Sequence, residues 1–360
     1  MDMTTEKTEK GKVIVGLSGG VDSSVAALIL KRQGYEVIGV TMRQFETEDT
    51  TELEDAQKIA AFLRIPHIVI DMQKEFKEEV IDYFVSEYLA GRTPNPCIMC
   101  NPGVKFAALM KAMKSQDADY IATGHYAKIH RLENGRYTIA LNHTGKDQTY
   151  ALCRLSQEQL SHLLTPLNDL DKETVRNLAK EEGIPVACKK DSQDICFVEK
   201  GKYFDFIAHQ AQLDGTRDNI MAGGRKEGNF IDEEGNILGQ HKGISHYTIG
   251  QRKKLGLSLN RPVFVKEIRV LTNEIVISTD SDVFFDSLFC DNLVLMGTDR
   301  IEDGEVLTAK IRYAHEGSLC RVYNDNGLRV EFEKPVRAVT PGQAIVFYKD
   351  DCVYASAIIS

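Results

Sequence analysis

The chain has 360 residues and a net charge of −9, enough sequence for two or three domains that each bury a core. An acidic average excludes a protein that is basic over its whole surface, the usual character of a nucleic-acid-binding protein. The start of the chain, residues 1–11, is polar and mixed in charge, and no apolar segment is long enough to cross a bilayer. We therefore expect a cytoplasmic protein with no membrane partner, whose eight cysteines are reduced thiols.

The first part of the chain alternates short apolar runs with amphipathic segments. Strands are expected at 13–17, 37–41, 67–71 and 119–123, and helices at 24–33, 53–63, 73–89 and 105–114. This alternation predicts an α/β fold, a doubly wound parallel sheet with helices on both faces. A further helix at 171–182, with Asp171 as its N-cap, is assigned to the same domain. Ligands of such sheets bind at the carboxyl ends of the strands.

The second part changes character after about residue 202. Glycine-rich turns separate short alternating runs, which predict antiparallel strands at 263–268, 274–278, 306–313, 328–332 and 344–347. We place domain boundaries near Lys200 and Thr279, which gives domains at 1–200, 201–279 and 280–360. The second half is therefore expected to be mostly β.

The segment Gly16-Leu17-Ser18-Gly19-Gly20-Val21-Asp22-Ser23-Ser24 carries the clearest functional pattern, because it joins a predicted strand to a predicted helix. Backbone N–H groups of a glycine-rich turn, together with the positive end of the following helix, bind anions. The lysine and the spacing of a Walker loop are missing. The pattern predicts another kind of phosphate-binding loop, and an ordinary strand–helix turn is the alternative.

Two polar segments carry cysteines. Pro94 and Pro96 disfavour a regular helix, so Cys97 and Cys100 are expected at the end of a stiff loop. Cys196 follows Lys189 and Lys190, which would favour its thiolate. A Cys-x-x-Cys pair can be redox-active, metal-binding or incidental, and spacing alone leaves these open. The remaining cysteines are interpreted as packing residues: Cys153, Cys188, Cys290, Cys320 and Cys352.

A basic stretch interrupts the acidic chain between His241 and Val270. Only Glu267 opposes its cations, which are Lys242, Arg252, Lys253, Lys254, Arg261, Lys266 and Arg269. A local basic face on an acidic protein can bind RNA, and a solvated charged surface is the alternative interpretation.

Seven motifs in chain order resemble the tRNA-specific 2-thiouridylases, a family of N-type ATP pyrophosphatases. The first is the loop at Ser18. The others are Asn95-Pro96-x-x-x-Cys100-Asn101, Gly124-His125-Tyr126-Ala127, Lys146-Asp147-Gln148-Thr149-Tyr150, Ser192-Gln193-Asp194-Ile195-Cys196-Phe197, Tyr247-Thr248-Ile249-Gly250-Gln251-Arg252 and Pro341-Gly342-Gln343. The resemblance spans almost the whole chain and implies a small central domain followed by a C-terminal β-barrel.

The resemblance also implies an activity. ATP, with Mg²⁺, would adenylate the C2 oxygen of the wobble uridine in tRNA for Lys, Glu and Gln, and a persulfide would then deliver sulfur, leaving 2-thiouridine, AMP and pyrophosphate. Cys196 would bear the persulfide and Cys100 would be the second catalytic thiol. The implied partners are the anticodon region of tRNA and a persulfide donor protein or cysteine desulfurase.

Other roles carry over by position. The residues implied for ATP are Gly16, Leu17, Ser18, Gly19, Gly20, Val21, Asp22, Ser23, Met42 and Gly124, with Asp22 also near Mg²⁺. The residues implied for tRNA are Asn95, Pro96, Cys97, His125, Lys146, Asp147, Gln148, Arg312, Tyr313 and Gln343. Tyr313 suits base stacking, and a core tyrosine in a strand is the alternative.

Two positions depart from the family pattern. Cys97 stands where many relatives have an aspartate, so Cys97, Cys100 and Cys196 are also candidates for ligands of an iron–sulfur cluster. Lys254 stands where relatives often have glycine, and we interpret it as adding only charge. Two other functions stay open: another adenylating enzyme of this loop class, such as a 4-thiouridine, argininosuccinate or lysidine synthetase, and a tRNA-binding protein without catalysis.

Overall fold

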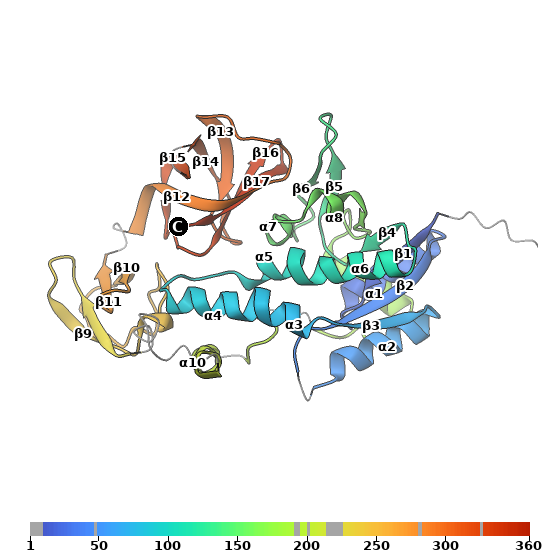
Figure 1. Ribbon diagram of the computed structural model, residues 1–360, viewed down its shortest axis with the longest axis horizontal. Helices are drawn as coiled ribbons and strands as arrows, with labels where there is room; N and C mark the ends of the chain where they lie inside the picture. Colours follow the sequence, from blue (N-terminus) through green and yellow to red (C-terminus); the bar gives the residue numbers. More distant parts are fainter. Residues whose placement is uncertain are drawn as a thin grey trace, which may run out of the picture. The chain divides into compact units, whose positions relative to one another are not determined.

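A computed structural model describes residues 10–46, 49–190, 195–199, 202–213, 226–279, 283–324 and 327–360. The chain forms two compact units, and the colours of Figure 1 follow the sequence through both. The first unit comprises Met1–Glu79, Ile98–Gln193 and Asp351–Val353, and the second comprises Val80–Cys97, Asp194–Asp350 and Tyr354–Ser360. Each unit has a sheet and a core of its own, so each is described by itself.

A five-stranded parallel sheet forms the centre of the first unit. Its strand order is β3-β2-β1-β4-β7, from β1 (Lys12–Gly16), β2 (Glu36–Arg43), β3 (His67–Asp71), β4 (Tyr120–Ala122) and β7 (Leu163–Leu164). Because β1 lies between β2 and β4, the chain adds strands first on one side of β1 and then on the other. This order confirms the predicted doubly wound sheet and places a ligand site beside the carboxyl end of β1.

Helices cover both faces of this sheet. Val13 and Val15 of β1 share one core cluster with α1 (Val21–Arg32), α2 (Thr51–Leu63) and α9 (Lys172–Glu181). Successive strand residues point to opposite faces, and α6 (Ala107–Ser115) packs against β1 as well, with Leu109 nearest to Gly16. The predicted N-cap of α9 is confirmed, since the Asp171 carboxylate accepts a hydrogen bond from the Thr174 N–H at 2.7 Å.

The segment between α4 (Asp82–Leu89) and α6 differs from its prediction. Instead of a loop, Cys97 and Cys100 lie in a short helix, α5 (Pro96–Cys100), which continues through a π-helical segment at Asn101–Phe106 into α6. Pro96 occupies the first helical position, where its missing N–H costs nothing, and the Asn95 side chain accepts a hydrogen bond from the Cys97 N–H at 3.2 Å. Of the two prolines that suggested a stiff loop, Pro96 therefore starts a helix, whereas Pro94 lies in the irregular segment before it.

The predicted 73–89 helix is present with an interruption. It consists of α3 (Gln73–Phe76), a π-helical segment at Lys77–Ile81, and α4 (Asp82–Leu89). The first unit also contains elements that the sequence pattern did not predict: a hairpin of β5 (Lys128–Arg131) and β6 (Tyr137–Ala140), and the short helices α7 (Thr149–Leu152) and α8 (Gln157–Ser161).

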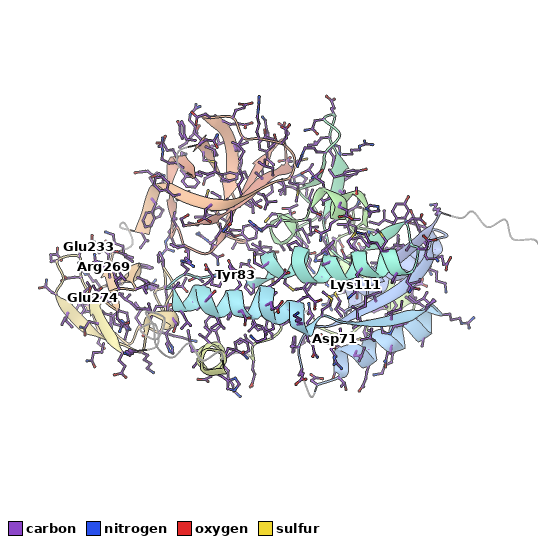
Figure 2. The ribbon with its side chains drawn as sticks, in the orientation of Figure 1. Asp71, Tyr83, Lys111, Glu233, Arg269 and Glu274 are labelled. Carbon is purple, nitrogen blue, oxygen red and sulfur yellow. The ribbon has the colours of Figure 1, made fainter. Side chains whose placement is uncertain are left out.

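The second unit contains two β domains together with α4 and α10 (Tyr203–Leu213). The central domain is a four-stranded sheet, β10-β11-β8-β9, formed by β8 (Gly228–Ile231), β9 (Ile237–His241), β10 (Phe264–Arg269) and β11 (Glu274–Ser278). Its core contains Phe230, Tyr247 and Val265. Arg269 and Glu274 lie directly opposite one another on β10 and β11, and Figure 2 labels both.

The C-terminal domain is a closed barrel, as the family resemblance implied. Its strands are β12 (Phe284–Leu295), β13 (Glu305–Lys310), β14 (Ser318–Asn324), β15 (Leu328–Arg337), β16 (Ala344–Lys349) and β17 (Cys352–Ile359). They pair in the order β12-β15-β14-β13-β16-β17, and an additional pairing of β12 with β17 closes the ring. Leu307, Val322 and Phe347 belong to its core.

None of the helices in the described ranges combines the length and the apolar composition that a membrane span requires.

Candidate active site

The phosphate-type loop joins β1 to α1. Gly19 adopts a positive φ of +69°, and a Cβ there would lie 2.5 Å from the Glu52 carbonyl oxygen, so only glycine fits. Gly20 is the N-cap of α1, and the Ser23 hydroxyl donates to its carbonyl oxygen at 3.1 Å. The Ser18 N–H in turn donates to the Ser23 hydroxyl at 3.3 Å. These bonds hold the loop around the positive end of a twelve-residue helix.

Two other segments brace this loop. Gly124 follows β4, and a Cβ at this position would lie 2.6 Å from the Asp22 carbonyl carbon, so the turn after β4 lies directly against the first turn of α1. The Lys189 ammonium donates to the Gly19 carbonyl at 3.1 Å and to the Asp55 carboxylate at 2.8 Å, and this lysine lowers the pKa of Asp55. Lys189 therefore binds the loop, and its predicted effect on the Cys196 thiolate stays a prediction.

A cavity of about 460 Å³ opens at the carboxyl ends of the strands, a size typical of small-molecule sites. Most of the residues implied for ATP line it: Gly16, Leu17, Ser18, Asp22, Ser23, Met42 and Gly124. Gly19, Gly20 and Val21 complete the adjoining loop and helix start. His125 and Gln148, which were implied for tRNA, line the same cavity. The sequence analysis missed several other lining residues, among them Thr41, Gln44, Phe45, Asp49, Lys105 and Phe106.

Asp22 is engaged by two lysines and a tyrosine. Its Oδ1 accepts hydrogen bonds from the Lys172 ammonium at 2.7 Å and the Tyr126 hydroxyl at 2.8 Å, and its Oδ2 accepts one from the Lys146 ammonium at 3.2 Å. The two ammonium groups outnumber the carboxylate, so this end of the cavity favours an anion. Lys172 was missed because it lies 150 positions from Asp22 in the chain.

Both oxygens of the Asp22 carboxylate accept charge-assisted hydrogen bonds, so Mg²⁺ at this residue would share the carboxylate with two ammonium groups, and this metal site stays a prediction. Within the described ranges, no group of three or more His, Cys, Asp or Glu side chains is arranged to hold a metal ion. The iron–sulfur cluster on Cys97, Cys100 and Cys196 stays a prediction.

His125 is held as a neutral ring. Its Nδ1 lies 2.8 Å from the Thr123 hydroxyl, and its ring stacks on Phe106 with centroids 6.0 Å apart. Burial lowers the pKa of His125 to about 3, and the charges of Lys105 and Lys146 act in the same direction. A neutral imidazole stacked on a phenyl ring is a flat surface suited to an aromatic base.

The motif at 146–150 is bound within its own unit. The Lys146 ammonium lies 4.6 Å from the centre of the Tyr126 ring, and Gln148 accepts a hydrogen bond from the Tyr126 N–H at 2.8 Å. Asp147 binds the backbone N–H of Asn142 and the hydroxyl of Thr149, which fixes the turn before α7. Their contacts with tRNA stay predictions.

Cys100 lies against the cavity wall. Only 4% of the residue is exposed, and the Gln44 amide donates to its sulfur at 3.6 Å. Gln44 itself lines the cavity, so a single side chain connects the nucleotide-sized space to a thiol. The expectation that Cys100 stands in a polar loop is therefore wrong.

Cys97 and Cys196 are exposed thiols in the second unit. Beside Cys196, the Phe197 ring packs edge-on against Phe84 of α4 with centroids 5.3 Å apart, and against Phe206 of α10 at 5.4 Å. Ser192, Gln193 and Asp194 of the same motif lie outside the described residues. The Cys196 thiol is therefore accessible from solvent, and the packing of Phe197 holds the neighbouring backbone.

Among the cysteines interpreted as packing, Cys153, Cys290 and Cys320 are buried and Cys352 is half-buried, but Cys188 is exposed, which corrects that interpretation. Burial raises the pKa of both Cys290 and Cys320 to about 12. These two thiols stay protonated at neutral pH and are unreactive.

The C-terminal positions implied for tRNA have different surroundings. Tyr313 is 58% exposed, so it is not a core tyrosine. Arg312 donates to the Arg337 carbonyl at 2.7 Å. The Gln343 amide donates to the Thr93 carbonyl at 2.6 Å, a contact between residues 250 positions apart. The sequence analysis had no signal for these partners.

The basic stretch is partly neutralised. Lys266 pairs with Glu233, and Arg269 pairs with Glu267 at 3.1 Å (Figure 2 labels Glu233 and Arg269). Five other cations of the stretch are exposed: Lys242, Arg252, Lys253, Lys254 and Arg261. Lys254 has a φ of +63°, the left-handed region that favours glycine, so its departure from the family pattern strains the backbone as well as adding charge.

Comparisons with known proteins agree with this architecture. The family models described as "tRNA methyl transferase HUP domain", "tRNA methyl transferase PRC-barrel domain" and "Aminomethyltransferase beta-barrel domain" match residues 11–200, 221–279 and 285–359. A Lachnoclostridium phytofermentans protein named tRNA-specific 2-thiouridylase MnmA is 50% identical, covering 97% of this chain and 99% of that protein. A Clostridium perfringens protein of the same name is 45% identical, covering 97% and 98%. The chain belongs to the tRNA-specific 2-thiouridylase family.

Proposed function

We propose that the protein catalyses the ATP-dependent 2-thiolation of the wobble uridine in tRNA. The observation that carries the proposal is the lining of the cavity. The phosphate-type loop at Ser18 and the side chain of Gln44 line the same nucleotide-sized space, and Gln44 is hydrogen-bonded to the Cys100 sulfur. A phosphate site alone fits many enzymes, and a buried thiol alone fits packing. Together they support a reaction that uses a nucleotide and sulfur in one place.

The first step is adenylation of the base. The C2 oxygen of the uridine attacks the α-phosphorus of ATP, the bond between the α- and β-phosphates breaks, and pyrophosphate leaves with its electron pair. Loop N–H groups near Ser18, with the ammonium groups of Lys146 and Lys172, stabilise the negative charge that develops on the leaving pyrophosphate. The C2 oxygen, a poor leaving group, becomes part of AMP, which is a good one.

The second step replaces this oxygen with sulfur. Cys196 carries the persulfide, and the Cys100 thiolate attacks the inner sulfur, which expels sulfide and leaves a Cys100–Cys196 disulfide. Sulfide adds to C2 and AMP departs with the oxygen. The two electrons that reduce the persulfide sulfur come from the cysteines, so an external dithiol must reduce the disulfide before the next cycle. In an alternative order, the base first forms an adduct with a protein thiol.

The target base must reach this space from the anticodon stack. Extrusion of a nucleotide into a pocket is the general solution for enzymes that modify a base. The His125 and Phe106 stack and the exposed ring of Tyr313 supply flat surfaces for this purpose. We assign the tRNA contacts to these residues and to the exposed cations of the basic stretch.

Thiolation is favoured over methyl transfer, the reaction named in two of the family models. The relatives that match the chain over nearly its whole length are named for thiolation. A methyl transfer would also leave a loop suited to pyrophosphate, and a thiol at its cavity, without a role.

The test is a complete reaction with unmodified tRNA, ATP, Mg²⁺, a dithiol and a cysteine desulfurase with its cysteine substrate. Mass analysis of the digested tRNA should find 2-thiouridine at the wobble position, with one AMP and one pyrophosphate released for each sulfur added. Formation of 4-thiouridine or of a methylated uridine would contradict the proposal.

A further inference from the structure

Two of the matched motifs have no part in the chemistry above, yet both converge on Thr93 in the second unit. The Thr93 N–H donates to the Pro341 carbonyl at 2.8 Å, and the Thr93 hydroxyl donates to the Thr248 hydroxyl at 3.2 Å. The Gln343 amide donates to the Thr93 carbonyl at 2.6 Å. We call these four residues the Thr93 junction. Three polar groups of a single residue are thus bound by segments from both β domains.

Two glycines at this contact, Gly342 and Gly91, have no room for a side chain. Gly342 has a φ of +88°, and a Cβ there would lie 3.0 Å from the Thr93 nitrogen. Gly91 has a φ of +71°, and a Cβ there would lie 2.9 Å from a methyl group of Val270. The central domain and the barrel therefore approach the chain at 91–93 as closely as glycine allows.

The partners of Thr93 are themselves fixed. The Gln343 carbonyl accepts a hydrogen bond from the Ile359 N–H at 2.9 Å, and the Gly342 N–H donates to the Ile359 carbonyl at 2.9 Å. On the helix side, the Arg92 side chain donates to the buried Glu87 carboxylate of α4 at 2.7 Å. The junction is therefore anchored to the end of β17 and to α4.

The link from Thr93 to the thiols is stiff. Pro94 and Pro96 each have a fixed φ, and both are buried. Asn95, between them, caps α5 by accepting the Cys97 N–H. A chain held at Thr93 and followed by two prolines enters α5 with little freedom, so the junction sets where that helix begins.

We propose that the Thr93 junction is a positioning device for α5, the helix that carries Cys97 and Cys100. Gln343 and Thr248 act on the reaction through Thr93, so Gln343, which the sequence implied as a tRNA contact, is a positioning residue. This inference rests on the proposed function for the role of the thiols. It gives the two β domains a part in catalysis, because they fix the position at which α5 begins.

The experiment compares Gln343→Leu and Thr248→Val with the wild type in the full-length protein. Thr248→Ser retains the hydroxyl and should behave as wild type, and Gln240→Leu makes the same change as Gln343→Leu at an exposed position of β9. The first readout is amide hydrogen exchange in 91–97, which needs no catalysis. A hydrogen bond lost at about 1 kcal/mol corresponds to roughly fivefold faster exchange of the Thr93 and Cys97 amides.

The second readout is single-turnover thiolation at saturating tRNA and ATP. We expect the rate to fall about tenfold in Gln343→Leu and Thr248→Val, while the dissociation constants for ATP and tRNA change by less than about twofold. Weakened tRNA binding with unchanged exchange at Thr93 would make Gln343 a direct contact and overturn the inference. Wild-type behaviour of both variants in both readouts would overturn it as well. If the wild type itself does not thiolate, the proposed function fails, whereas the exchange result still tests the junction.

Discussion

The Lys172 ammonium lies 2.7 Å from the Asp22 carboxylate, which joins the first residue of α9 to the first turn of α1. Lys146 holds the other carboxylate oxygen at 3.2 Å. Each of these side chains is less than a third exposed. The phosphate-type loop therefore has a preassembled cationic neighbour, although it lacks the lysine of a Walker loop.

Removing one of these cations should weaken nucleotide binding. Lys172→Gln leaves one ammonium to balance Asp22, and losing a charge-assisted hydrogen bond costs about 1.5–3 kcal/mol. We expect ATP to bind roughly 10- to 100-fold more weakly by calorimetry. Lys180→Gln, at an exposed site of the same helix, is the control. Equal ATP affinity in both variants would remove Lys172 from the site.

Gly124 should not tolerate a side chain. The Cβ of Gly124→Ala would lie 2.6 Å from the backbone of Asp22, and backbone atoms have no alternative rotamer. We expect a loss of about 1–3 kcal/mol in the free energy of unfolding of this unit, seen as a lower melting temperature. Gly16→Ala is the matched control, because its Cβ would meet Leu109 at 3.6 Å and the Ala122 carbonyl oxygen at 3.9 Å, which are ordinary van der Waals distances. A Gly124→Ala protein as stable as Gly16→Ala would mean that the turn moves freely.

His125 should remain neutral throughout the physiological pH range. Its pKa is lowered to about 3, so the unfolded chain binds a proton at this residue between about pH 6.5 and 3 when the folded protein does not. The contribution of the buried, neutral His125 ring to the free energy of unfolding is therefore complete above pH 6.5. It is lost as the pH falls from 6.5 towards 3. NMR titration should show an imidazole signal, absent in His125→Asn, that does not shift between pH 5 and 8. A midpoint near 6.5 would contradict this environment.

Lys254 offers a test of backbone strain. Its φ of +63° penalises any residue with a Cβ, so Lys254→Gly should be more stable than Lys254→Ala by about 1 kcal/mol. The neighbouring Lys253 is also exposed but does not have a positive φ. There, Lys253→Ala should be more stable than Lys253→Gly. Thermal unfolding of the four variants measures both differences. The same order at both sites would show that position 254 carries no special strain.

Local pattern was sufficient for much of the fold. Strand β3 begins and ends where the apolar run at 67–71 predicted. The flanking patterns also predicted a strand and a helix on either side of the loop at Ser18, although α1 begins at Val21 and not at residue 24. These features depend on neighbours in sequence. The helix α5 was missed because Pro96 was interpreted as a breaker, although proline is favoured at a first helical position.

The parts of the site that could not be predicted depend on distant residues. Lys172 meets Asp22 across 150 positions, and Gln343 meets Thr93 across 250. Neither contact leaves a periodicity or a spacing in the sequence. Gln44 follows β2 without any motif of its own, so its bond to Cys100 appears only when β2 and α5 are placed together.

The most direct test of the central claim uses Cys196→Ser with α-phosphate-labelled ATP and unmodified tRNA. If adenylation precedes sulfur transfer and Cys196 brings the sulfur, label should accumulate on the wobble nucleoside, with one pyrophosphate released, no 2-thiouridine formed and tRNA affinity preserved. Continued formation of 2-thiouridine by this variant, or pyrophosphate release without label on the tRNA, would contradict the account.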